Sequence, residues 1–124
     1  MTEAHGLRVR DYLEHMLDAM QRIHQYVADI HDVDEFTRRT IVHDAVVRNL
    51  EIIGEAARNV RNADADFIAR HARIPWAAMS AMRNRITHGY FDINLSIVWQ
   101  TVRVDLPGLR EDISALVRSL DGQG

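Results

Sequence analysis

Residues 13–30 read LEHMLDAMQRIHQYVADI, and the pattern in this stretch decides the fold class. Its apolar residues recur at alternating spacings of three and four, which places them on one face of a helix. They are Leu13, Met16, Met20, Ile23, Val27 and Ile30. The stretch therefore predicts a long first helix with a single buried face.

Two further stretches, residues 42–60 and 95–120, show the same helical spacing. Asp32 and Asp34 precede the first of them, and either carboxylate is suited to cap the start of a second helix. Pro107 lies inside the other stretch, where a proline kinks a helix or divides it in two. Each stretch predicts a helix, and the last one is expected to be interrupted at Pro107.

The helix predicted over residues 42–60 has apolar residues on more than one side. Val47 and Ile52 lie off its main apolar face, which indicates burial on two sides. Gly54, Ala56 and Ala57 are small enough to let another helix approach closely. We therefore expect two neighbours to pack against this helix.

Two shorter helices are predicted between these stretches. One covers residues 64–71, and the other begins at Pro75, whose missing N–H costs nothing in a first turn. The second is expected to end near Gly89, because glycine readily adopts the left-handed conformation that stops a helix. The side chains that this helix is expected to turn inward are Trp76, Met79 and Met82.

The chain as a whole predicts an all-α fold. No segment alternates with a period of two over a useful length, so the helical stretches indicate an up-and-down helical bundle of four to five helices. A chain of 124 residues is long enough for one core and too short for two ordinary domains. Residues 1–124 are therefore predicted to form a single domain, with loose ends at residues 1–6 and 121–124.

The composition narrows the class of protein. Hydrophobic residues make up 47% and charged residues 27%, the balance of a globular protein rather than a disordered one. No apolar run approaches the roughly 18 residues that a membrane span needs, and charged residues among the first ten argue against a signal peptide. The absence of cysteine excludes disulfides, zinc–thiolate sites and cysteine nucleophiles. We expect a cytoplasmic protein.

The net charge of -3 is unevenly distributed. Residues 56–91 contain six arginines and two acidic residues, which gives this third of the chain a charge of +4. The flanking thirds are acidic, with charges of -5 over residues 1–55 and -2 over residues 92–124. A local basic patch on an acidic body is compatible with binding to nucleic acid.

The segment Arg83-Asn84-Arg85-Ile86-Thr87-His88-Gly89-Tyr90 lies in this basic third and carries the candidate chemistry. Arginine offers planar donors that suit a phosphate, and histidine titrates near neutral pH, as a general acid or base must. Together these groups indicate phosphodiester chemistry that needs no metal.

The spacing of Arg83 and His88 raises a geometric difficulty. Five residues of ideal helix correspond to about 500°, so the two side chains would lie about 140° apart. Either the helix unwinds before Gly89, or Arg83 acts in a site built from two copies of the motif across a symmetric interface. A simpler alternative is that Arg83 and His88 only complement the helix dipole, with Tyr90 as a packing residue.

The motif and several separate blocks resemble the HEPN superfamily. Arg-x4-His-x-Tyr is similar to the motif of HepT, the toxin of the HepT–MntA toxin–antitoxin pairs. Residues 48–56 (RNLEIIGEA) resemble the second-helix signature of that family, and residues 74–76 (IPW) and 82–90 resemble its central block. Residues 98–99 and 105–107 resemble its final helix. The likeness extends over residues 8–118.

This resemblance implies a metal-independent ribonuclease that forms a homodimer and needs no cofactor. His88 would be the base that activates a ribose 2′-OH, and it or its copy in the other subunit would protonate the leaving oxygen. Arg83 would bind the scissile phosphate, and Asn84 would orient the phosphate or the imidazole. Attack by the 2′-OH implies a 2′,3′-cyclic phosphate product, with either messenger or transfer RNA as substrate, and no activity on DNA.

The resemblance also gives Tyr90 a role. In HepT–MntA pairs the antitoxin is a nucleotidyltransferase that adds AMP to the tyrosine of this motif. Such a modification two residues from His88 would place negative charge where the RNA phosphate binds. Tyr90 is therefore the expected acceptor of inhibitory AMPylation, and an MntA-like nucleotidyltransferase is the expected partner.

Other readings of the sequence compete with this one. The chain could be a non-catalytic helical partner or substrate-binding subunit of a nucleotidyltransferase, or a purely structural helical dimer. The seven histidines form no His-Glu-x-x-His metal motif, and Glu51 and Glu55 are more simply explained by salt bridges to Arg48 or Arg58. The presence of both Arg83 and His88 favours the enzyme.

Overall fold

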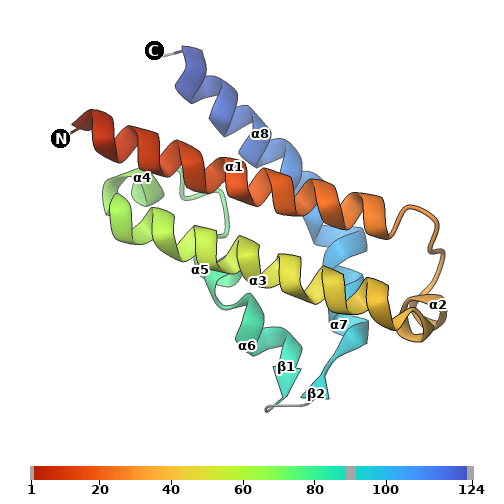
Figure 1. The fold of residues 1–124 in the computed structure, drawn as a ribbon. Coiled ribbons are helices and arrows are strands. Elements are labelled where there is room, and N and C mark those ends of the chain that lie inside the picture. Colours follow the sequence, from red (N-terminus) through yellow and green to blue (C-terminus); the bar gives the residue numbers. More distant parts are fainter. Residues whose placement is uncertain (1, 89–91, 123–124) are drawn as a thin grey trace.

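The computed structural model describes residues 2–88 and 92–122 and shows a bundle of helices (Figure 1). The elements in chain order are α1 (Thr2–Tyr26), α2 (Val33–Arg38), α3 (Thr40–Ala63), α4 (Ala65–Arg70), α5 (Trp76–Ser80), α6 (Met82–Ile86), β1 (Thr87–His88), β2 (Asp92–Ile93), α7 (Leu95–Gln100), the π-helical segment η1 (Thr101–Asp105) and α8 (Leu106–Gly122). The all-α prediction is confirmed, since the two strands have only two residues each.

The core forms where the apolar faces of α1 and α3 meet. These two long helices lie side by side, and α8 crosses α1 (Figure 1). The six apolar residues that predicted the first helix are all buried. On the apolar face of α3, Val46, Ile53, Ala57 and Val60 are buried, and Val42 is partly buried. Val27 and Ile30 are buried in the turn after α1, because the helix itself ends at Tyr26.

The start of the second predicted helix is divided in two. Asp32 caps the short helix α2, where its Oδ1 accepts a hydrogen bond from the Glu35 N–H at 2.8 Å, and α3 begins separately at Thr40. The short helix buries Phe36, whose ring centroid lies 5.1 Å from that of Trp99 on α7. This aromatic contact ties α2 to the last part of the chain, which local spacing does not reveal.

Gly54 allows the close approach that was predicted for α3. A Cβ atom at this position would lie 2.8 Å from the carbonyl oxygen of Met79 on α5. The backbones of α3 and α5 are therefore in close contact at Gly54, where no side chain separates them. The predicted close approach is confirmed.

The helix predicted from Pro75 to Gly89 is wrong at its end. It is divided into α5 and α6, and it stops at Ile86, after which Thr87 and His88 pair with β2 in an antiparallel ribbon. The Asn94 N–H donates to the Ile86 carbonyl at 2.7 Å. The last carbonyl of α6 is therefore bonded to a residue beyond the turn and not to a further turn of helix. Gly89 lies outside the described residues. Trp76, Met79 and Met82 are buried, as predicted.

The interruption predicted at Pro107 is present as a π-helical segment. The Leu106 N–H donates to the Thr101 carbonyl five residues earlier, just before the proline removes the next donor. Pro107 itself lies in the first turn of α8, where a missing N–H is tolerated. The helical stretch from α7 to α8 therefore changes direction at η1 (Figure 1).

The two ends of the chain lie at the same end of the bundle (Figure 1). Arg10 on α1 pairs with Glu14 at 3.2 Å and with Asp121 on α8. The hydrogen bond that Arg10 donates to Glu14 and the charge of Asp121 raise the pKa of the Arg10 guanidinium above its ordinary value. Of the ends predicted to be loose, residues 2–6 and 121–122 belong to helices, and residues 1 and 123–124 lie outside the described residues.

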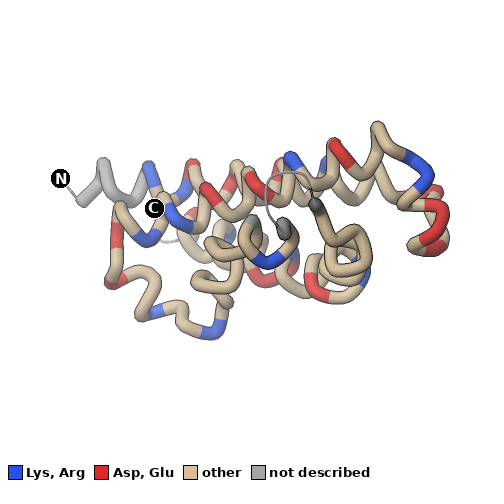
Figure 2. The backbone as a smooth tube through the Cα atoms, turned by 90° about the horizontal axis from the view of Figure 1, so that it is seen from below, with Lys and Arg blue, Asp and Glu red and all other residues tan. Residues whose placement is uncertain are grey.

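Charge is spread over the whole molecule, with an acidic cluster at one end. Figure 2 shows acidic residues gathered at the end that contains α2, whose first turn carries Asp34 and Glu35. Among the described residues, no helix is both long enough and apolar enough to cross a membrane.

Candidate active site

The predicted catalytic residues lie at the corner formed by α6 and the β1–β2 ribbon. Arg83 and Asn84 belong to α6, and His88 is the last residue of β1. The Asn84 side chain is exposed. For Arg83 and His88 we describe the backbone alone, and Tyr90 lies outside the described residues.

The backbone of this corner removes the geometric difficulty seen in the sequence. The angle of about 140° between Arg83 and His88 assumes a continuous helix, whereas α6 ends at Ile86 and His88 belongs to a strand. Unwinding before Gly89 was one of two solutions considered, and the backbone adopts it. A site shared between two subunits stays a prediction.

The corner is held in place from both sides. Met82 and Ile86 are buried and attach α6 to the core. On the other side Asn94 connects β2 to α7: its N–H donates to the Ile86 carbonyl, and its Oδ1 accepts the Ile97 N–H at 3.1 Å. Because one residue ends α6 and also starts α7, the ribbon between them has a defined position.

The strand register adds a residue that the sequence analysis missed. Thr87 pairs with Ile93, and His88 pairs with Asp92. The sequence does not reveal this pairing, because strands of two residues are too short to show an alternating pattern.

Residues 48–56, which resemble the second-helix signature of the family, lie in α3 and are partly buried and partly exposed. Asn49 is 5% exposed, its Nδ2 donates to the Ala45 carbonyl at 2.9 Å, and its Oδ1 has no partner among the described residues. Glu55 pairs with Arg58 at 3.9 Å, as predicted. A shallow cavity of about 410 Å³ follows this part of α3 and reaches Ser80 at the end of α5.

Metal ligands are not grouped in the part of the chain that the structure describes. There, no three histidine, aspartate or glutamate side chains lie close enough together to hold a metal ion.

A comparison with protein families identifies the family of this chain. The family model described as "Ribonuclease HepT-like" matches residues 16–116, which include the two long core helices' facing segments and the whole α6–β1–β2 corner. The chain belongs to the HepT-like ribonuclease family. The resemblance found in the sequence is thereby confirmed.

Curated relatives agree with the family. This HepT-like chain is 38% identical over 101 residues to "Probable ribonuclease HepT" of Thermococcus cleftensis, covering 82% of the chain and 88% of the relative. It is 33% identical over 109 residues to "Putative RNase TTE0752" of Caldanaerobacter subterraneus subsp. tengcongensis, covering 88% and 94%.

A third relative is longer than the chain. It is the "Gamma-glutamylcyclotransferase and putative RNase MJ0434" of Methanocaldococcus jannaschii, 35% identical over 113 residues. The match covers 91% of the HepT-like chain but spans only about half of that relative (49%). The comparison with solved structures gave no significant match.

These comparisons support a ribonuclease function in general. They say nothing of individual residues, so the roles of Arg83, Asn84, His88 and Tyr90 stay predictions. The homodimer and the nucleotidyltransferase antitoxin stay predictions as well.

Proposed function

We propose that this HepT-like protein is a metal-independent endoribonuclease and the toxin of a type VII-like toxin–antitoxin pair. The observation that carries the proposal is the corner at α6, where a chain of this ribonuclease family has Arg83 and Asn84 in one short helix and His88 in the strand that follows it directly. Outside this corner, the comparisons with named ribonucleases support the class of reaction.

The proposed reaction uses the 2′-OH of the substrate as nucleophile. His88 accepts the proton of this hydroxyl, whose oxygen attacks the neighbouring phosphorus, and the P–O5′ bond breaks. The 5′ oxygen leaves with a proton from the histidine or from its copy in a second subunit. Arg83 stabilises the charge that develops on the phosphate oxygens, and Asn84 orients the phosphate or the imidazole.

The active unit in this proposal is a homodimer with the two motifs facing one another. A two-fold axis brings the same surface of each subunit together, so a motif near the axis meets its own copy. Each cleft would then contain groups from both chains.

The antitoxin in this proposal is an MntA-like nucleotidyltransferase that transfers AMP to the hydroxyl of Tyr90. The oxygen of Tyr90 attacks the α-phosphorus of ATP, and pyrophosphate leaves. The new phosphodiester carries negative charge into the position that the RNA phosphate needs, and it blocks cleavage by repulsion and bulk.

Replacement of His88 tests the proposal directly. We expect purified His88→Ala protein to cleave an end-labelled RNA about 10²–10⁴-fold more slowly than the wild type, as is typical for loss of a general acid–base group. The products of the wild type should end in a 2′,3′-cyclic phosphate, and DNA of the same sequence should stay intact. His31→Ala, which removes an exposed histidine far along the chain, is the matched control.

Retention of full cleavage by His88→Ala would overturn the assignment. Wild-type protein that binds RNA and a nucleotidyltransferase but cleaves nothing would favour a non-catalytic subunit instead.

A further inference from the structure

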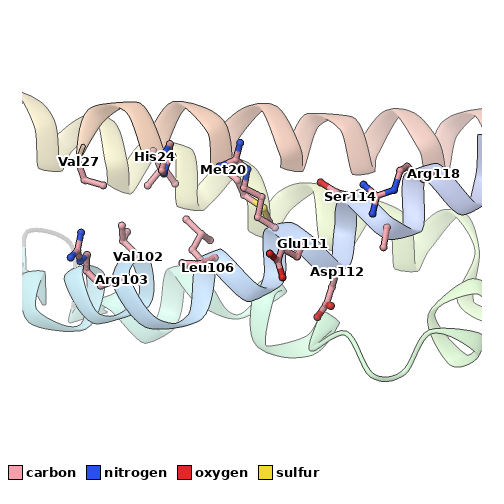
Figure 3. Close-up of a pocket in the computed structure, with 14 residues that line it drawn as sticks. Met20, His24, Val27, Val102, Arg103, Leu106, Glu111, Asp112, Ser114 and Arg118 are labelled. Atoms are coloured by element: carbon pink, nitrogen blue, oxygen red, sulfur yellow. The ribbon is translucent and has the colours of Figure 1, made fainter. Parts of the chain in front are cut away.

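A groove runs between α1 and the helical stretch from η1 into α8, with a volume of about 970 Å³ (Figure 3). This is near the upper end of the roughly 300–1,000 Å³ of typical ligand pockets. Its floor is apolar: Met20 on α1 and Val27 just after α1 point toward the opposite helix, and Val102 and Leu106 point back toward α1. All four are buried, with 1–6% of their surface exposed. These side chains close the bottom of the groove, and Arg103 and Arg118 at its rim stay exposed.

The rim of the groove is basic. Arg103, Arg110 and Arg118 all line it, although they are the only arginines in a third of the chain whose net charge is -2. They lie seven and eight residues apart, roughly 10–12 Å along a helix. Among the described residues, none of the three forms an ion pair.

Two of these arginines are held in position by neutral or aromatic partners. Nη2 of Arg110 donates a hydrogen bond to Oε1 of Gln21 on α1. The guanidinium carbon of Arg103 lies 5.2 Å from the centre of the Trp99 ring. A guanidinium has five N–H donors, so these contacts leave donors for an anion.

The acidic residues of the groove reduce this charge only in part. Asp112 is paired with Arg73 at 3.6 Å, and its side chain points away from α1 (Figure 3). Glu111 is exposed at the rim. Three arginines, with His24 across from them on α1, therefore face one carboxylate that has no ion pair among the described residues.

We propose that this groove binds single-stranded RNA, with phosphates on the arginines and bases in the groove between them. A basic track beside apolar and planar surfaces is the usual arrangement for binding an unpaired strand, and guanidinium planes also stack on bases. Charge favours a nucleic acid as the occupant, because a row of arginines without ion pairs among the described residues matches the repeating phosphates of a strand.

The inference rests on the proposed function, since the groove would hold part of the strand that is cut at the α6 corner. The two places are separated in the chain by a single helix. Strand β2 ends at Ile93, α7 follows, and η1 with the first groove residues begins at Thr101.

The test measures binding without cleavage. An RNA made of 2′-O-methyl riboses lacks the nucleophile, and its affinity for the intact protein can be followed by fluorescence anisotropy. For Arg103→Glu/Arg118→Glu we expect Kd to rise about tenfold or more, and the slope of log K against log salt to shrink by about 1.4 for two lost phosphate contacts. Circular dichroism and urea unfolding check that the variant is folded.

A matched control distinguishes loss of binding in the groove from a general effect of the changed net charge. Arg38→Glu/Arg61→Glu makes the same change in charge at two exposed arginines on α2 and α3, outside the groove, and should leave the affinity nearly unchanged. Equal losses in the two double variants would overturn the inference. An RNA affinity equal to that of the wild type in the groove variant would also overturn it. If the sedimentation of that variant changes while its RNA affinity does not, the groove is a protein interface instead.

The proposed function is judged separately, by cleavage of a ribodinucleotide by the wild type. If the dinucleotide and longer RNAs stay intact, the nuclease proposal fails while the binding data still decide the groove.

Discussion

Gly54 shows how one residue sets the distance between two helices. The missing side chain lets α3 meet the backbone of α5, with Met79 O only 2.8 Å from the place of a Cβ atom. Gly108, in the first turns of α8, has nothing within 4 Å of the same place. The same substitution at these two glycines therefore has opposite consequences.

We predict that Gly54→Ala lowers the free energy of unfolding by about 1–3 kcal/mol, because the backbone of α5 must move. Gly108→Ala should raise it by roughly 0.5–1 kcal/mol, since alanine favours the helix and meets no neighbour. Urea unfolding of both proteins measures the difference. A gain in stability for both would show that α5 yields easily at Gly54.

Tyr90 carries a prediction about control of the proposed toxin. Tyr90→Phe keeps the ring but removes the oxygen that we propose as the acceptor of AMP, so the variant should cleave RNA as the wild type does and resist the proposed antitoxin. Co-expression with the partner nucleotidyltransferase, growth measurements and the mass of the purified toxin test this. Complete silencing of Tyr90→Phe by an active antitoxin would exclude AMPylation of Tyr90 as the mechanism.

At the scale of elements, the long helices follow from the sequence and the corner near the site does not. The spacing of apolar residues predicts α1, α3 and α8, because each buries one continuous face over many turns. Helices α5 and α6 and the β1–β2 ribbon are too short for a period to appear. Their ends depend on hydrogen bonds such as that from Asn94 to Ile86, which join residues separated by the turn.

Asn94 is the residue through which that corner can be tested. Its Oδ1 caps α7 by accepting the Ile97 N–H. We predict that Asn94→Ala lowers the free energy of unfolding by about 0.5–2 kcal/mol, whereas Asn94→Asp, which keeps the acceptor, loses little. Urea unfolding measures both. Equal losses would mean that the amide N–H groups of the side chain matter more than the cap.

At the scale of the whole molecule, the proposed homodimer predicts complementation between two inactive proteins. If Arg83 of one subunit acts with His88 of the other, mixing Arg83→Ala with His88→Ala restores roughly a quarter of wild-type activity, since about half of the dimers are mixed and each has one intact site. RNA cleavage after exchange of subunits measures it. Sedimentation must first show that both proteins dimerise.

If the mixture stays as inactive as its components although both dimerise, Arg83 and His88 act within one chain. That result would agree with the unwound end of α6 and would leave the dimer a structural role.

The sequence by itself determined the helical class, the residues of the main core and the family, since these depend on apolar periodicity and on motifs within single segments. Tertiary structure alone decided where α6 stops, that His88 pairs with Asp92, and that three arginines line one groove beside α1. A charge count assigns residues 92–124 a net -2, because it adds charges along the chain. Recognition depends instead on which charges face the same space, and that is settled only when α8 packs across α1.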